Sequence, residues 1–217
     1  MIKNLLVKLR AARKSAQPPL NTPFFEKHTK HRNLMPLYDL WPIHGKAFIS
    51  PSASIIGEVK IGPECGIYNG VVIRGDINSV TILDSTYICP NTVIHTAASL
   101  PTGTTAEVNI GLNCLIGSRC TLYSCTIDDF VHVGAGSVIL EGARLEKGCM
   151  IGPGSVVPPG RLIPSKQLWA GNPVRYVKDL YEPEEINFGD TLALEMFNAE
   201  KYLMQFEEFG HAHMYDS

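Results

Sequence analysis

A repeat of six residues governs the central part of this chain, because large apolar residues recur at that spacing from residue 49 to residue 169. The spacing fits neither an α-helix, with about 3.6 residues per turn, nor an ordinary β-strand, whose side chains alternate. The large apolar positions are Ile49, Ile55, Ile61, Ile67, Ile73, Ile82, Ile88, Ile94, Ile110, Ile116, Leu122, Ile127, Val133, Ile139, Leu145, Ile151, Val157, Ile163 and Trp169. A small or branched residue follows most of them by four positions.

Self-similarity at this short period is typical of a parallel β-helix, in which each six-residue rung forms a short strand plus a corner. Three rungs close one triangular turn, the large apolar residue points inward, and the small residue fills the corner. We therefore predict an all-β solenoid, a left-handed parallel β-helix. Its hand is taken from known hexapeptide proteins, because the spacing alone does not show handedness.

Charge is unevenly spread, although the net charge of the 217 residues is only −2. Residues 1–32 contain eight Lys or Arg residues and one acidic residue, Glu26. Residues 1–14 place aliphatic side chains on one helical face and basic side chains around the other, which predicts a basic amphipathic helix. Such a helix fits a mitochondrial transit peptide or attachment to an anionic membrane surface, and a solvated tail is the plain alternative. The basic cluster at 27–32 has no interleaved aromatic residues, so we expect no nucleic-acid partner.

We predict three parts: a basic N-terminal arm with its helix and a cap at 1–44, the β-helix at 45–175, and a linker with a C-terminal helix at 176–217. The acidic stretch 182–185 is taken as linker, and Asp190 as the cap that begins the helix. An apolar face on that helix should place it along a flank of the prism. No apolar run in the sequence approaches the roughly 20 residues that a membrane span needs.

One column of outward-facing side chains follows from counting rungs by three. Arg74, His95 and Tyr123 each come directly after a large apolar residue on successive turns of one face, so they should stack about 5 Å apart. Ser118 belongs to the preceding rung, on an adjacent face, and would meet His95 only across a subunit interface. His132 is expected to be a surface group, because the spacing supplies it with no partner ligands.

Four stretches of the sequence are distinctive in combination. They are the RGD-x-N stretch that begins at Arg74, the N-x-V-x-H stretch that ends at His95, residues 116–129, and the turn at 169–173. They resemble the gamma-class carbonic anhydrases, and specifically their mitochondrial relatives in respiratory complex I. The resemblance covers about residues 45–180. The hexapeptides and the turn alone would also fit many acyltransferases.

The resemblance implies a metal held by three histidines at each trimer interface, two from one subunit and one from its neighbour. His95 matches the first of them, whereas Ser118 and Tyr123 stand where the other two are expected. Arg74 and Asp76 match a pair that bridges subunits in the family. A catalytic zinc needs three good protein ligands, and serine and tyrosine are poor ones, so no catalytic residue and no zinc cofactor is expected on this chain's own sites. Zinc remains possible at an interface between partner subunits.

The sequence thus predicts a catalytically inactive gamma-carbonic-anhydrase-like subunit. Its expected partners are similar subunits in a heterotrimer, membrane-arm subunits of complex I, and an anionic membrane surface contacted through the N-terminal helix. The expected location is the matrix side of the mitochondrial inner membrane, as a peripheral protein. Two alternatives stay open. One is a hexapeptide acyltransferase that uses acyl-CoA, with the loop at 97–107 as a substrate wall, and the other is an adaptor β-helix in another assembly.

Overall fold

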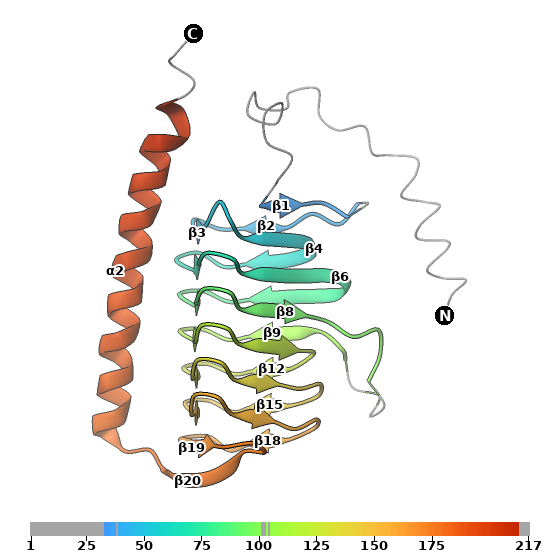
Figure 1. Cartoon of the computed structure of the whole chain (residues 1–217), viewed down its shortest axis with the longest axis vertical. Helices are drawn as coiled ribbons and strands as arrows, with labels where there is room; N and C mark the ends of the chain where they lie inside the picture. Colours follow the sequence, from blue (N-terminus) through green and yellow to red (C-terminus); the bar gives the residue numbers. More distant parts are fainter. Residues whose placement is uncertain (1–32, 38, 101–102, 104, 213–217) are drawn as a thin grey trace.

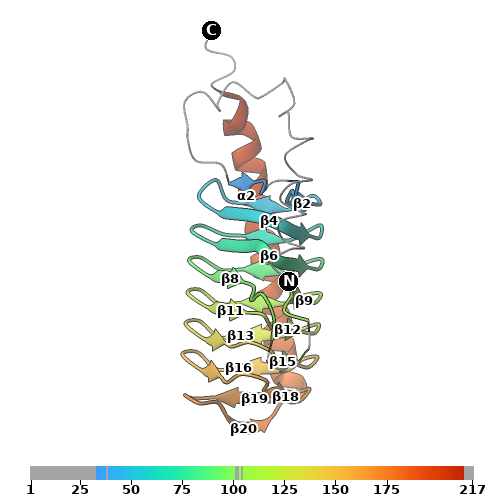
Figure 2. The same cartoon turned by 90° about the vertical axis from the view of Figure 1, so that its right-hand side faces the viewer.

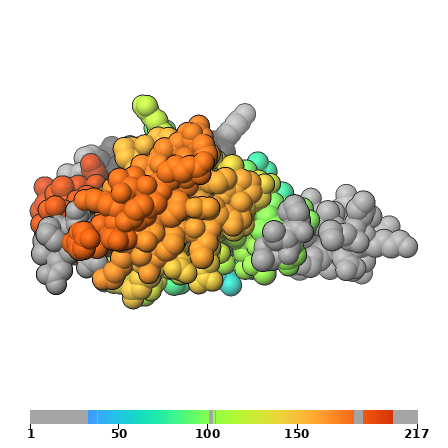
Figure 3. All heavy atoms as spheres, turned by 90° about the horizontal axis from the view of Figure 1, so that it is seen from below, coloured from blue at the N-terminus to red at the C-terminus, as the bar shows by residue number. Residues whose placement is uncertain are grey.

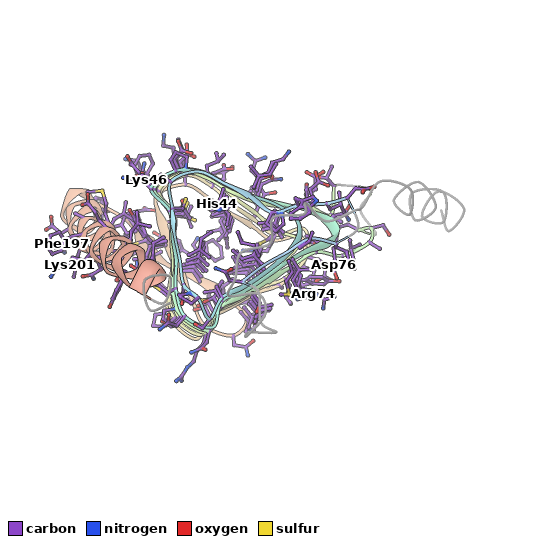
Figure 4. The ribbon with its side chains drawn as sticks, turned by 90° about the horizontal axis from the view of Figure 1, so that it is seen from above. His44, Lys46, Arg74, Asp76, Phe197 and Lys201 are labelled. Carbon is purple, nitrogen blue, oxygen red and sulfur yellow. The ribbon has the colours of Figure 1, made fainter. Side chains whose placement is uncertain are left out.

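The computed structural model describes residues 33–37, 39–100, 103 and 105–212, with the backbone alone at 182–186 and 204–212. Short parallel strands stack in rungs along one long axis, and the long helix labelled α2 runs beside the stack (Figure 1). Seen along that axis, the stack is a triangular prism with the helix on one face (Figure 4). This is the predicted left-handed parallel β-helix with a helix on its flank.

One face of the prism is an eight-stranded sheet. Its strands are β3 (Phe48–Ile49), β5 (Gly66–Ile67), β7 (Tyr87–Ile88), β10 (Leu115–Ile116), β13 (His132–Val133), β16 (Met150–Ile151), β19 (Gln167–Ala170) and β20 (Arg175–Asp179). All of these pair in parallel except β20, which runs antiparallel to β19.

The other two faces form one twelve-stranded sheet, because two long strands bend around the corner between them. The long strands are β4 (Ser54–Ile61) and β6 (Val72–Ile82). The strands on the β8 side are β1 (Leu34–Met35), β8 (Val93–His95), β11 (Thr121–Tyr123), β14 (Val138–Ile139) and β17 (Val156–Val157). The strands on the β9 side are β2 (Ile43–His44), β9 (Val108–Ile110), β12 (Thr126–Ile127), β15 (Arg144–Leu145) and β18 (Leu162–Ile163). Figure 2 shows these rungs stacked one above another.

The repeat places its side chains as predicted. Every large apolar residue of the repeat is buried except Ile49, which is partly exposed, and the small residues at the corners are buried as well. Just before many of these corners the backbone is left-handed, for example at Glu64 (φ 58°), Gly70 (φ 68°) and Asn91 (φ 60°). This conformation is costly for most side chains, and Gly and Asn tolerate it best. Each rung therefore combines a buried apolar strand residue with a sharp, locally specified turn.

Helix α2 (Glu182–Ala212) begins earlier than predicted, at Glu182 and not at Asp190, so residues 182–185 are helix and not linker. Acidic residues near a helix start and Pro183 in the first turn favour this beginning. The helix packs on β3, β5 and β7, with Phe188 and Ala199 buried against the sheet. The prediction of a helix on the flank is confirmed, but its start was wrong.

The two ends of the stack differ. At the upper end β1 and β2 pair with β4, so residues near 34–44 do cover the first rung, although Trp41 is 55% exposed. At the lower end β20 pairs with β19, the last strand of the α2 face. Figure 3 shows this end of the molecule from below. β20 was missed because its five residues are all exposed and carry no alternating pattern.

Among the described residues no helix is long and apolar enough to cross a membrane.

Candidate functional site

The predicted column of outward side chains is present on the face that contains β6, β8 and β11. Arg74 of β6 is in register with His95 of β8, and His95 with Tyr123 of β11. The rings of His95 and Tyr123 stack, with centroids 4.3 Å apart and an interplanar angle of 21°. Each side chain follows a buried residue of its strand, so the inward position of that residue forces its neighbour outward. One surface of the imidazole is therefore covered by the phenol.

Burial and a nearby cation set the protonation of His95. Partial burial lowers the pKa of His95 below its usual 6.5, and the positive charge of Arg74 lowers it further, while Asp76 acts in the opposite direction. The imidazole is consequently neutral near pH 7, which is the form that could bind a metal.

Arg74 and Asp76 pair with each other within this single chain, since the Arg74 guanidinium donates to an Asp76 carboxylate oxygen. The Arg74 side chain remains 51% exposed and that of Asp76 20%. An exposed ion pair of this kind contributes only about 0–1 kcal/mol to folding. The side chain of Arg74 is thus available on the surface of the prism opposite α2, where Figure 4 labels it.

Ser118 lies on a different part of the surface, just after β10 and beneath α2. It lines a hollow together with Cys89, one turn of the coil earlier on the same face, and Glu195 of α2. The hollow lies outside the His95 column, as the sequence predicted for Ser118. What the sequence reasoning missed is that α2 of the same chain reaches Ser118. One signal in the sequence pointed to this contact: Glu195 is a polar residue on the otherwise apolar face of the helix that packs on the sheet.

The cysteines do not supply a substitute ligand. Among the residues that the structure describes, no three His, Cys, Asp or Glu side chains are grouped so that they could hold a metal ion within one chain. The thiol of Cys120 donates to the Gly134 carbonyl at 3.2 Å, and burial raises its pKa. Burial raises the pKa of Cys125 to about 12. Both thiols are therefore protonated near pH 7 and do not carry the negative charge of a thiolate ligand.

The loop between β8 and β9 folds back against the column. The Ser124 hydroxyl accepts from the Ala97 amide at 2.7 Å and donates to the Ala106 carbonyl at 2.8 Å, so it ties both ends of the loop to the coil. Leu100 of the loop is buried in a cluster that packs against Tyr123. The loop therefore supports the phenol that stacks on His95. The sequence showed the loop at 97–107 but not its contact with Tyr123.

His132 is not the surface group that the sequence analysis expected. Its ring stacks on Phe188 of α2 at a centroid distance of 5.5 Å, and burial lowers its pKa. The side chain is a packing element between the sheet and the helix.

Comparisons with known proteins place this geometry in a family. Residues 124–159 match the family described as bacterial transferase hexapeptide (six repeats). The chain is 37% identical over 176 residues to gamma carbonic anhydrase 3, mitochondrial, of Arabidopsis thaliana, and the match covers 81% of this chain and 68% of that protein. This chain belongs to the gamma-carbonic-anhydrase-like family.

Two further similarities agree with this membership. Gamma carbonic anhydrase 1, mitochondrial, of Arabidopsis thaliana is 40% identical over 166 residues, covering 76% of this chain and 60% of that protein. A hexapeptide transferase family protein from Anaplasma phagocytophilum is 32% identical, with a TM-score of 0.72 over 78% of this chain and 97% of that chain. The chain therefore spans less than two thirds of the length of gamma carbonic anhydrase 1.

Within this gamma-carbonic-anhydrase-like chain, the three positions that the resemblance assigns to metal ligands fall in two places. His95 and Tyr123 are stacked on one face, and Ser118 lies beneath α2. The residues present in one chain do not fit a zinc ion, because a phenol and a hydroxyl replace two of the expected imidazoles.

Proposed function

We propose that this chain is a catalytically inactive structural subunit of a gamma-carbonic-anhydrase-like trimer. The observation that carries the proposal is the Tyr123 ring, which stacks on His95 at a centroid distance of 4.3 Å in the place of a second histidine. At one interface of such a trimer this chain would offer one imidazole, His95, where two are expected, and at the other it would offer the Ser118 hydroxyl where one is expected, so each site would fall one imidazole short. Its role would then be to support the assembly. Any zinc would be held where partner subunits meet each other.

The interface in this proposal is the face that carries Arg74 and Asp76. The half-exposed guanidinium can exchange its partner within the chain for a carboxylate on a neighbour, or bind both. A narrow prism buries little apolar surface by itself, so association through a flat face adds the burial that one chain lacks.

The proposed location is the matrix side of the mitochondrial inner membrane, in the membrane arm of respiratory complex I. Support comes from the word mitochondrial in the names of the Arabidopsis relatives and from the basic amphipathic pattern of residues 1–14. Those residues lie outside the part of the chain that the structure describes. Identifying by mass spectrometry the proteins that co-purify with the full-length chain would test the location, and an assembly without complex I subunits would favour the adaptor alternative.

The catalytic part of the proposal is tested by restoring the missing imidazoles. The unmodified full-length chain should contain no stoichiometric zinc and should not hydrate carbon dioxide. The double variant Ser118→His/Tyr123→His should bind zinc that a chelator removes, because three imidazoles would then meet at each interface of a homotrimer.

Each single variant is the matched control, since it supplies only two imidazoles per interface and should remain without zinc. Chelator-removable zinc together with hydration activity in the unmodified chain would contradict the structural role.

Acyl transfer is the second candidate, and the similarity to a hexapeptide transferase family protein favours it. Against it, Leu100 and Ala106 of the predicted substrate wall are buried against the chain itself. Saturable binding of coenzyme A to the purified chain, competed by acetyl-CoA, would support acyl transfer and count against the inactive subunit.

A further inference from the structure

A hollow of about 370 Å³ lies between α2 and the turns that follow the strands of the sheet beneath it. We call it the α2 pocket. Its lining residues come from β3, from the turns after β5, β7 and β10, and from α2: Phe48, Tyr68, Asn69, Cys89, Pro90, Ser118, Glu195, Asn198 and Tyr202. Its volume lies near the lower end of the roughly 300–1,000 Å³ range of small-molecule sites. A ligand of the size of one substituted ring fits inside it with room to spare.

Aromatic rings form one wall of the α2 pocket. Phe48 and Tyr202 stack with centroids 5.4 Å apart, and Tyr68 meets Tyr202 edge-on at 6.2 Å. The faces of such rings carry negative charge density and attract cations. This wall joins the solenoid to the helix, because Tyr202 belongs to α2 and the other two rings belong to the coil.

A carboxylate stands in the same pocket, and no ion pair joins it to a cation among the residues that the structure describes. Glu195 of α2 accepts a hydrogen bond from the Tyr68 hydroxyl at 2.7 Å. Burial first, and then this bond to Glu195, raise the pKa of Tyr68, so the phenol remains a neutral donor. None of the lining residues is a lysine, an arginine or a histidine. The negative charge of Glu195 is therefore solvated by a phenol and is not paired with a cation of the pocket.

A second hollow beside the same helix has a different balance of charge. It is lined by Lys46 as well as by Glu64 and Glu200, so a cation of the chain already stands beside its carboxylates. The exposed side of α2, where Figure 4 labels Phe197 and Lys201, has its own cation placed 4.9 Å over a ring. Of these three places, the α2 pocket alone combines an aromatic wall and a carboxylate with no lysine among its described lining residues.

We propose that the α2 pocket binds a small organic ammonium ion that has an apolar or aromatic body. The ammonium group would donate to the Glu195 carboxylate and lie against the ring faces of the wall. Ser118 and Asn198 add oxygen acceptors for its remaining N–H groups. The apolar body would pack on Phe48 and Pro90. An anion is disfavoured because it would meet Glu195 at close range, and a neutral ligand would leave the carboxylate unpaired.

The test compares three probes of similar size and different charge on the unmodified full-length chain, by calorimetry or by chemical-shift titration. Benzylamine, as its ammonium ion, should bind saturably. Benzyl alcohol should bind at least about ten-fold more weakly, because it lacks the charge-assisted hydrogen bond. Benzoate should bind more weakly still. Equal affinity for benzylamine and benzyl alcohol would overturn the proposal, and so would the absence of saturable benzylamine binding.

Two variants then locate the site. Glu195→Gln keeps the shape and an acceptor for Tyr68 but removes the charge, so it should weaken benzylamine binding by about ten-fold or more. Glu200→Gln removes an acid from the same helix but from the other hollow, and it should change the affinity by less than about two-fold. A larger loss of benzylamine affinity for Glu200→Gln than for Glu195→Gln would place the amine in the other hollow and refute the assignment. Neither result depends on zinc content, so this proposal and the inactive-subunit proposal fail separately.

Discussion

Tyr87 is a fully buried phenol whose hydroxyl has no hydrogen-bond partner among the residues that the structure describes. Its ring lies so close to Gly66 that a Cβ there would approach the ring carbon Cδ1 to 2.7 Å, and it belongs to the cluster that joins the sheet to α2. An unsatisfied buried hydroxyl costs about 1–3 kcal/mol. Burial raises the pKa of Tyr87 to about 12, so ionisation does not relieve this cost near pH 7.

Tyr87→Phe should therefore stabilise the chain, since it removes the hydroxyl and keeps the ring. We expect the free energy of unfolding to rise by about 1 kcal/mol. For a chain of this size that corresponds to a gain of about 2–4 °C in Tm. The measurement is urea and thermal unfolding of the full-length chain at one fixed protein concentration, because assembly makes Tm depend on concentration.

The matched control is Tyr68→Phe, which removes a hydroxyl from the same cluster. That hydroxyl donates to Glu195 at 2.7 Å, so its loss should lower the free energy of unfolding by about 1–2 kcal/mol. A decrease of about 1 kcal/mol or more for Tyr87→Phe would show that the Tyr87 hydroxyl has a stabilising partner, and the reasoning would be refuted.

Three further predictions concern assembly, pH and the loop beside the column. Arg74→Ala should lower the fraction of trimer in analytical ultracentrifugation, whereas Arg144→Ala, which also breaks an exposed ion pair within the chain, should not. The pKa values of His95 and His132 are lowered from 6.5 in the fold, so the unfolded chain binds more protons, and stability should be full above about pH 6.5 and fall on acidification. The double variant with both histidines replaced by Gln should lose less free energy of unfolding on acidification. The same dependence of stability on pH in the variant and the unmodified chain would contradict the assignment to these histidines. Ser124→Ala should lower the free energy of unfolding by about 1–3 kcal/mol and increase amide exchange in the loop, because two buried backbone groups lose their partner.

Local repetition explains why so much of the coil could be predicted. In each rung the inward residue and the corner residue are set by positions only a few residues apart, so counting in sixes also gave the register of Arg74, His95 and Tyr123 across three strands. The spacing of nine residues between Ile73 and Ile82 departs from six, and the structure shows a register shift between Gly57 and Val59, where β4 faces this part of β6.

The contacts of α2 could not be predicted by the same counting. Tyr68 and Glu195 are separated by 127 positions, and their hydrogen bond depends on where the helix lies against the coil. His132 was misread for this reason, since Phe188 of α2 covers it. The start of α2 was accessible in principle, because Pro183 and the acidic residues around it favour the first turn of a helix.

The antiparallel strand β20 has a consequence for the solubility of the whole molecule. A stack of parallel rungs resembles a short segment of cross-β fibril, and an open last rung would offer its backbone to the first rung of another chain. β20 occupies that edge and runs in the opposite direction, with all five of its side chains exposed and Arg175, Lys178 and Asp179 among them. A second copy arriving end-on would meet charged side chains on a reversed strand. On the α2 face, an arriving copy would therefore find a reversed strand in place of a parallel edge, while the other two faces end in the short strands β17 and β18.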